Sequence, residues 1–143
     1  MEIVFLVLHF LEKNATTGLK TKICGMELAS PIGLAAGFDK NADVFNATLS
    51  LGFGFVEVGT ITPNPQTGNP KPRLFRLPDE EALINKMGFN NKGMLYVSKN
   101  ARKPKLGIVG VNIGANAKSI NKVLDYTSVF ECLAHLFDYV TIN

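Results

Sequence analysis

The sequence contains no tryptophan and only two cysteines among its 143 residues. Cys24 and Cys132 are far apart and neither belongs to a CxxC or CxxH pair, so the sequence indicates neither a zinc site nor a disulfide framework. We expect reduced thiols of the kind found in cytosolic proteins. Blocks of like charge are also missing, since 15 basic and 12 acidic residues are dispersed and leave a net charge of +3. This pattern does not indicate a partner nucleic acid.

No apolar run is long enough to span a membrane. The most apolar stretch, residues 3–11, falls far below the roughly 20 residues of a membrane-spanning helix. It does not fit a secretory signal either, because Glu2 stands where basic residues are required. With 46% apolar and 19% charged residues, the composition is that of a globular protein with one ordinary core. We expect one domain, residues 17–143, preceded by a short apolar segment, residues 1–16.

Apolar runs and helical patterns alternate along the chain. Runs typical of strands cover residues 31–37, 54–61, 106–113 and 139–142. The first shows no alternation, which is typical of a strand covered on both faces. Helical spacing of apolar residues separates the runs at residues 44–51, 91–101 and 119–137, and Ser119 is placed to cap the last helix. Strands that alternate with helices predict a parallel sheet, either doubly wound or closed into a barrel.

Two short hairpins are predicted beside this alternation. Residues 19–27 alternate well enough to form a hairpin that leads into the first core strand. Residues 62–72 are rich in proline and glycine and cannot form regular structure. They lead into the runs 74–77 and 82–84, which indicate a hairpin excursion after the second strand. A loop of this length inside a compact domain is usually functional or disordered.

Three observations favour a barrel over a doubly wound sheet. No GxGxxG or GxxxxGK[ST] pattern follows the first strand, the long insertion lies at the C-terminal end of a strand, and polar residues gather at that same end of every strand. An eight-stranded barrel takes about 250 residues. The predicted fold class is therefore α/β, a partial TIM (β/α)8 barrel made of about its first half, strands 1 to 4.

Hydrogen-bonding residues lie at the ends of the predicted strands. Lys40, Thr60, Asn112 and Asn143 follow the four strands in order, and Asn85 closes the hairpin. A lysine at the mouth of a buried strand indicates an anion site, and an asparagine amide carries the acceptor and donors that match a pyrimidine edge. Read singly, such a lysine is usually solvated and such an asparagine usually satisfies a turn. Their shared position at one end of the sheet favours a ligand site.

Five sequence stretches carry a family resemblance. They are GLAAGFDK at 33–40, GFGFVEVGT at 52–60, PQTGNPKPR at 65–73, INKMGFN at 84–90 and GVNIGAN at 110–116. In this order, with helices between them, the chain resembles dihydroorotate dehydrogenase of class 2, the quinone-reducing, membrane-associated type, over about residues 18–143. The resemblance implies an FMN-binding β/α barrel that oxidises dihydroorotate to orotate in pyrimidine (UMP) biosynthesis and passes the electrons to a quinone.

The resemblance also implies roles for individual residues. The expected FMN contacts are Ala36, Gly37, Phe38, Asp39, Lys40, Thr60, Asn112 and Asn143. The expected substrate contacts are Lys40, Asn85, Lys86, Met87, Gly88, Phe89 and Asn143. No metal is expected. The catalytic base is expected beyond Asn143, so the chain by itself is predicted to be inactive. Residues 1–16 are expected to be the remnant of a helical segment in peripheral contact with the cytoplasmic face of a bacterial inner membrane, with the mitochondrial inner membrane or the cytoplasm as alternatives.

Two other interpretations stay open. The chain could be a non-catalytic, truncated half barrel that self-associates through its open sheet edge, because open edges invite pairing. It could also belong to an FMN-dependent barrel reductase with a different substrate. His9 and His135 lie in apolar helical stretches without a carboxylate in register, and we assign them no role.

Overall fold

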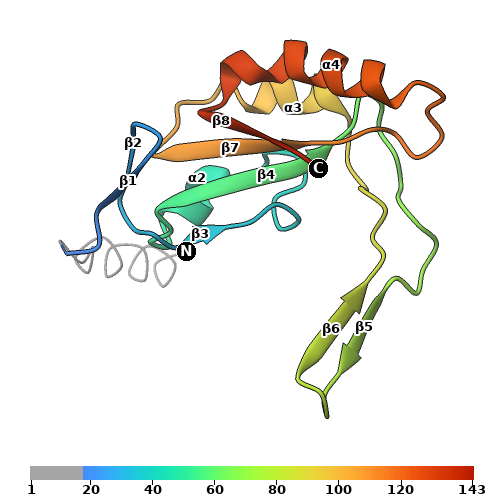
Figure 1. Ribbon diagram of the computed structural model, residues 1–143, viewed down its shortest axis with the longest axis horizontal. Coiled ribbons are helices and arrows are strands. Elements are labelled where there is room, and N and C mark those ends of the chain that lie inside the picture. Colours follow the sequence, from blue (N-terminus) through green and yellow to red (C-terminus); the bar gives the residue numbers. More distant parts are fainter. Residues whose placement is uncertain (1–17) are drawn as a thin grey trace, which may run out of the picture.

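The computed structural model describes residues 18–143, so the predicted segment 1–16 lies outside the described residues. Its centre is a four-stranded parallel sheet in the order β3-β4-β7-β8 (Figure 1). The strands are β3 (Gly33–Leu34), β4 (Phe55–Ile61), β7 (Ile108–Ile113) and β8 (Tyr139–Ile142). Because all of them run the same way, their carboxyl ends meet at one edge of the sheet.

The strand order follows the chain without reversal. A doubly wound sheet reverses its order at a switch point, whereas consecutive strands of a β/α barrel stay in sequence. The connecting elements are the helices α2 (Phe45–Leu49), α3 (Met94–Asn100), α4 (Lys122–Leu133) and the 3-10 helix η1 (Ala134–Leu136). The described part of the chain is therefore a partial β/α barrel, as the sequence predicted. None of the helices within residues 18–143 is long and apolar enough to cross a membrane.

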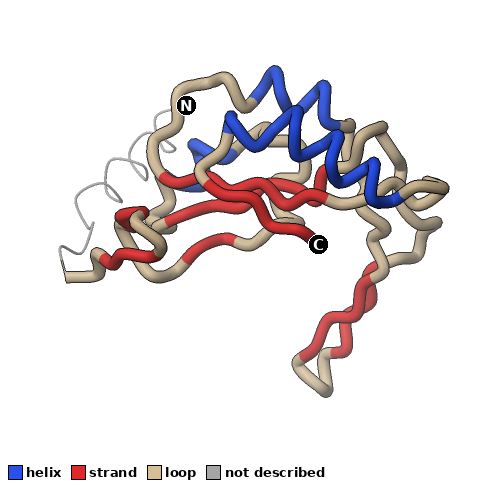
Figure 2. Tube along the Cα trace, turned by 45° about the horizontal axis from the view of Figure 1, so that its top comes forward, coloured by secondary structure: helices blue, strands red, loops and turns tan. Residues whose placement is uncertain are grey.

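One face of the sheet packs against the helices, which lie on the same side of it (Figure 2). Four valines of β4 and β7 are fully buried there, and they join a single core cluster with apolar side chains of all three α-helices. The cluster includes Val56, Val58, Val109, Val111, Phe45, Val97, Val129 and Leu133. Because side chains alternate along a strand, Glu57, between two of these valines, and Asn112, directly after Val111, project from the other face of the sheet.

Two aromatic rings lie on that other face, against glycine positions. The rings of Phe55 and Tyr139 meet edge to face with centroids 6.4 Å apart. A Cβ atom at Gly33 would lie 2.3 Å from the Phe55 ring, and one at Gly110 would lie 2.1 Å from the Tyr139 ring. Only glycine leaves room for these rings so close to the neighbouring strand.

Two antiparallel hairpins flank the sheet, as predicted. The first pairs β1 (Thr21–Ile23) with β2 (Met26–Leu28), and the second pairs β5 (Leu74–Leu77) with β6 (Ala82–Asn85). The second hairpin extends away from the body of the protein (Figure 1). An isolated bridge between Gln66 and Asn91 joins the two segments that connect this hairpin to the sheet. The loop that precedes it is therefore tied to the segment that follows it.

Two details of the sequence prediction are wrong. A strand covered on both faces was predicted at residues 31–37, but β3 contains only two residues and both are half-buried. The reason is its place at the edge of the sheet, where it pairs with β4 alone. Ser119 does not cap α4 either. Asn121 does so, because its side-chain oxygen accepts the N–H of Leu124 at 3.1 Å.

Candidate functional site

A cavity of about 1230 Å³ lies at the carboxyl edge of the sheet, on the face away from the helices. It is lined by residues from the strand ends and from the two segments that join the hairpin β5–β6 to the sheet. Most of the site residues predicted from the sequence meet there. They are Ala36, Gly37, Lys40, Thr60, Asn85, Met87, Gly88, Phe89, Asn112 and Asn143.

Three predicted site residues do not line the cavity. The Phe38 side chain is 67% exposed, and Lys86 lies near the Phe75 ring, with its Nζ 6.0 Å from the ring centroid. Asp39 is 3% exposed, and its carboxylate accepts the backbone N–H groups of Asp43 and Val44, both at 2.9 Å. The Asp39 carboxylate therefore shapes the turn before α2. The N-cap of that helix is Val44.

The loop that carries Lys40 is fixed to β4 by backbone hydrogen bonds. The N–H of Gly37 donates to the carbonyl of Gly59, and the N–H of Gly59 donates to the carbonyl of Asp39, both at 2.9 Å. Gly37 has φ +113°, a conformation that strains any residue with a side chain. A Cβ atom there would meet only Lys40 Nζ, at 3.9 Å, within 4 Å. The missing side chain thus leaves open space beside the lysine.

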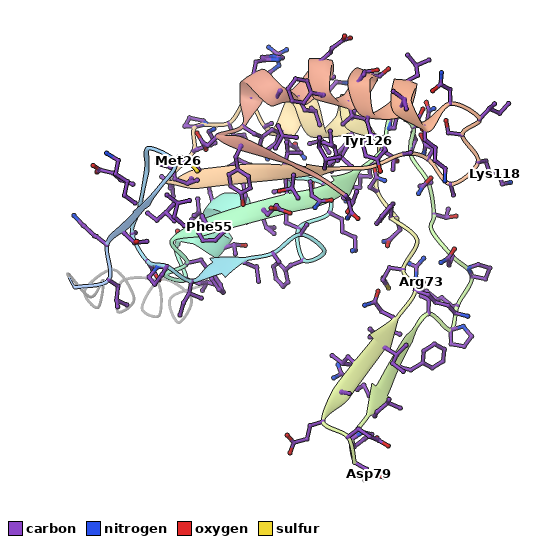
Figure 3. The ribbon with its side chains drawn as sticks, in the orientation of Figure 1. Met26, Phe55, Arg73, Asp79, Lys118 and Tyr126 are labelled. Atoms are coloured by element: carbon purple, nitrogen blue, oxygen red, sulfur yellow. The ribbon has the colours of Figure 1, made fainter. Side chains whose placement is uncertain are left out.

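Two cations of the cavity wall influence each other. Partial burial lowers the pKa of Lys40, and the positive charge of Arg73 lowers it further. Arg73 lies where the hairpin joins the body of the protein (Figure 3), and its Nη1 donates to the carbonyls of Thr67 at 2.7 Å and Asn69 at 3.1 Å. Within residues 18–143 neither cation forms an ion pair with an acidic side chain. The positive charges of Lys40 and Arg73 therefore suit the wall to an anionic ligand.

A chain of polar side chains crosses the strand ends. The Glu57 carboxylate accepts from Asn112 Nδ2 at 2.9 Å and from Thr141 Oγ1 at 2.7 Å. The Asn112 Oδ1 accepts from Thr60 Oγ1 at 2.6 Å and from Asn143 Nδ2 at 3.0 Å. Asn143 Nδ2 also donates to Thr60 Oγ1 at 3.1 Å. One connected network thus joins β4, β7 and the end of β8, and four of its five members line the cavity.

Tyr139 lies next to this network. Burial raises the pKa of its phenol, and the negative charge of Glu57 together with a hydrogen bond to that carboxylate raises it further. The phenol therefore stays protonated over the physiological range. The neutral Tyr139 phenol lies next to Glu57, the charged residue of the network.

Sequence reasoning missed several residues of the cavity wall, among them Glu57, Lys71, Arg73 and Asn90. Glu57 had a usable signal, because it is the one charged residue in the otherwise apolar strand around it. Arg73 and Lys71 carried none, since the path of a proline- and glycine-rich loop cannot be read from its composition. The Oδ1 atom of Asn90 is buried and finds no hydrogen-bond partner among the residues described.

The chemistry of this wall is binding and positioning. It offers three cations, four carboxamides, one carboxylate and a hydroxyl around one cavity. No group of three or more histidine, cysteine or acidic residues that could hold a metal ion occurs in residues 18–143. The set suits a planar heterocycle that bears hydrogen-bonding edges and a negative charge.

Comparison with curated proteins gives close relatives. The protein from Rhodopseudomonas palustris strain HaA2, named dihydroorotate dehydrogenase (quinone), is 54% identical over 127 residues. The protein of the same name from Novosphingobium aromaticivorans is 50% identical over 135 residues. The alignments cover 87% and 90% of this chain but only 35% and 39% of the relatives. The chain thus spans little more than a third of the length of these relatives.

Solved structures agree with this result. The ligand-free DHODH from Eimeria tenella superposes with a TM-score of 0.84 at 38% identity, covering 96% of this chain and 43% of that one. Its complex with ferulenol gives a TM-score of 0.82 and covers the whole of this chain. The family model for dihydroorotate dehydrogenase matches residues 18–143, all of the described part of the chain. The chain belongs to the dihydroorotate dehydrogenase family.

Proposed function

We propose that this chain supplies the FMN- and substrate-facing wall of a quinone-dependent dihydroorotate dehydrogenase. One observation carries the proposal, the convergence of Lys40, Asn112 and Asn143 from three strand ends on a single cavity. The names of the relatives support the reaction, since each is a dihydroorotate dehydrogenase that uses a quinone.

The residues of the wall fit FMN. Gly37 lets the backbone approach a flat ring without a side chain in the way, and its positive φ requires glycine. Lys40, Thr60 and Asn112 would hold the isoalloxazine edge, where fixed donors stabilise the charge that develops on reduction. FMN, when bound, supplies the acceptor for the two electrons that leave dihydroorotate. The volume of about 1230 Å³ exceeds that of an ordinary small-molecule site and leaves room for cofactor and substrate together.

The same wall suits dihydroorotate. Its carboxylate would lie near Lys40, which has no acidic partner within residues 18–143. Its ring amides would pair with Asn85 and Asn143, whose side chains line the cavity from the hairpin and from the end of β8. Binding an anion beside Lys40 would raise its pKa and so oppose the lowering that burial and Arg73 cause in the ligand-free protein.

The quinone is proposed as the second electron acceptor, and a membrane surface as the place where the protein meets it. The support is the shared name of the curated relatives and the apolar stretch 3–11 of the sequence. A short apolar segment of this kind can associate with the membrane interface without crossing it.

The proposal is tested with a chimera in which this chain replaces the matched 127 residues of the Rhodopseudomonas palustris relative. We expect dihydroorotate to bleach the flavin absorbance under anaerobic conditions and a quinone to restore it. Lys40→Met should abolish bleaching, whereas Lys92→Met, at an exposed lysine that pairs with Asp43, should not. A chimera that folds and binds FMN but bleaches only with another reductant would contradict the proposal and favour a different substrate.

A further inference from the structure

Glu57 determines how the Asn112 amide is turned. A carboxylate accepts hydrogen bonds and cannot donate them, so the group that Asn112 presents to Glu57 at 2.9 Å must be its NH2. The carbonyl oxygen of Asn112 therefore faces the opposite way. There it accepts from the Thr60 hydroxyl at 2.6 Å and from the Asn143 amide at 3.0 Å.

The orientation of Asn112 fixes that of Asn143 in turn. The Asn143 NH2 carries two protons, and they are directed to Asn112 Oδ1 at 3.0 Å and to Thr60 Oγ1 at 3.1 Å. The Thr60 hydroxyl donates its only proton to Asn112, so its oxygen can accept a hydrogen bond from Asn143. The carbonyl oxygen of the Asn143 side chain is the one hydrogen-bonding atom of that amide that these contacts do not use. It accepts no hydrogen bond from residues 18–143, and Asn143 lines the cavity.

We propose that Glu57 is a positioning residue that sets the hydrogen-bonding polarity of the cavity. Through Asn112 it turns the Asn143 side chain so that a carbonyl oxygen, and not an NH2 group, is offered to the ligand. This cavity then accepts a ring N–H at that position and disfavours a ring carbonyl. The identity of the ligand rests on the proposed function, but the orientation of the two amides is a property of the protein alone.

The isosteric substitution Glu57→Gln removes the constraint without changing the shape of the side chain. Glutamine can accept from Asn112 or donate to it, so both orientations of the amide become possible. The double variant Glu57→Gln with Asn112→Asp moves the acceptor-only carboxylate from position 57 to position 112. The aspartate accepts from the glutamine on one side and from Thr60 and Asn143 on the other, which restores the orientation of Asn143. Thr141→Val is the matched control, because it removes the hydrogen bond that Glu57 accepts from Thr141, at 2.7 Å, and leaves Asn112 in place.

The first readout needs no ligand. In nitrogen-15 spectra of the 15.5 kDa protein, the Asn143 side-chain NH2 should exchange slowly with water in the wild type, in Thr141→Val and in the double variant. In Glu57→Gln its exchange should be faster by about an order of magnitude, because the NH2 then turns toward the open cavity for part of the time. Equal exchange in the wild type and in Glu57→Gln overturns the proposal.

The second readout is the affinity for orotate. Removing a negative charge from the cavity would strengthen the binding of an anion if charge alone mattered. The positioning role predicts the reverse, a loss of about tenfold in Glu57→Gln and no loss in Thr141→Val. Tighter binding by Glu57→Gln contradicts the proposal. This affinity is measured on the chimera described above; if the wild-type chimera binds no orotate, the proposed function fails, while the exchange measurement still decides the role of Glu57.

Discussion

Asn112→Leu is expected to lower the free energy of unfolding far more than the small change in side-chain shape suggests. The side chain is 6% exposed, and leucine has nearly its shape, so the substitution removes hydrogen bonds and little packing. Three bonds are lost, one from the Asn112 NH2 to the charged Glu57 and two to the Asn112 oxygen, from Thr60 and Asn143. A hydrogen bond to a charged group contributes about 1.5–3 kcal/mol and a neutral one about 1 kcal/mol.

The expected loss in the free energy of unfolding is therefore about 3–5 kcal/mol. Urea denaturation followed by circular dichroism measures it, and the slope of the transition should not change, because the surface exposed on unfolding is the same. Thr141→Val, which removes a single bond to the same carboxylate, is the control, with an expected loss of about 1–3 kcal/mol. If Asn112→Leu costs no more than Thr141→Val, the network is not the cooperative unit that we describe.

Three further predictions concern packing, capping and charge. Gly110→Ala should lower the free energy of unfolding by about 1–3 kcal/mol in urea, because its Cβ would strike the Tyr139 ring; an unchanged midpoint would show that the ring moves freely aside. Asn121→Ala should cost about 1 kcal/mol and fray the start of α4 in amide exchange; full protection of that turn would refute the cap. Lys40→Met should stabilise the ligand-free protein at pH 7. The pKa of Lys40 is lowered in the folded protein, so the wild type should gain stability as the pH rises from that lowered pKa toward 10.5, and the variant should lose this gain. Equal pH profiles of stability for the two proteins would refute this.

The order of elements was predictable because it depends on local patterns. Apolar runs and helical spacing involve neighbours in the chain, and the strands and hairpins they indicated are present. The length of β3 was not predictable, because burial of an apolar run depends on how many strands flank it. Ile32 belongs to that run yet is 64% exposed at the sheet edge.

The candidate site was predictable in part for a similar reason. Carboxyl ends of parallel strands must share an edge, so Lys40, Thr60 and Asn112 could be grouped without coordinates. Asp39 could not be separated from its neighbours in this way, because a carboxylate that satisfies backbone N–H groups and one that faces a ligand look alike in sequence. The proximity of Arg73 to Lys40 likewise depends on the course of a loop that has no periodic pattern.

An orotate titration of the chimera, followed by NMR, tests most directly whether the strand-end groups form one site. The side-chain resonances of Lys40, Asn112 and Asn143 should shift together and yield one dissociation constant, because all three groups line the same cavity. Lys92, which lies outside the cavity wall and pairs with Asp43, should not shift. Separate dissociation constants for the three groups, or a response of Lys92 equal to theirs, would contradict the account.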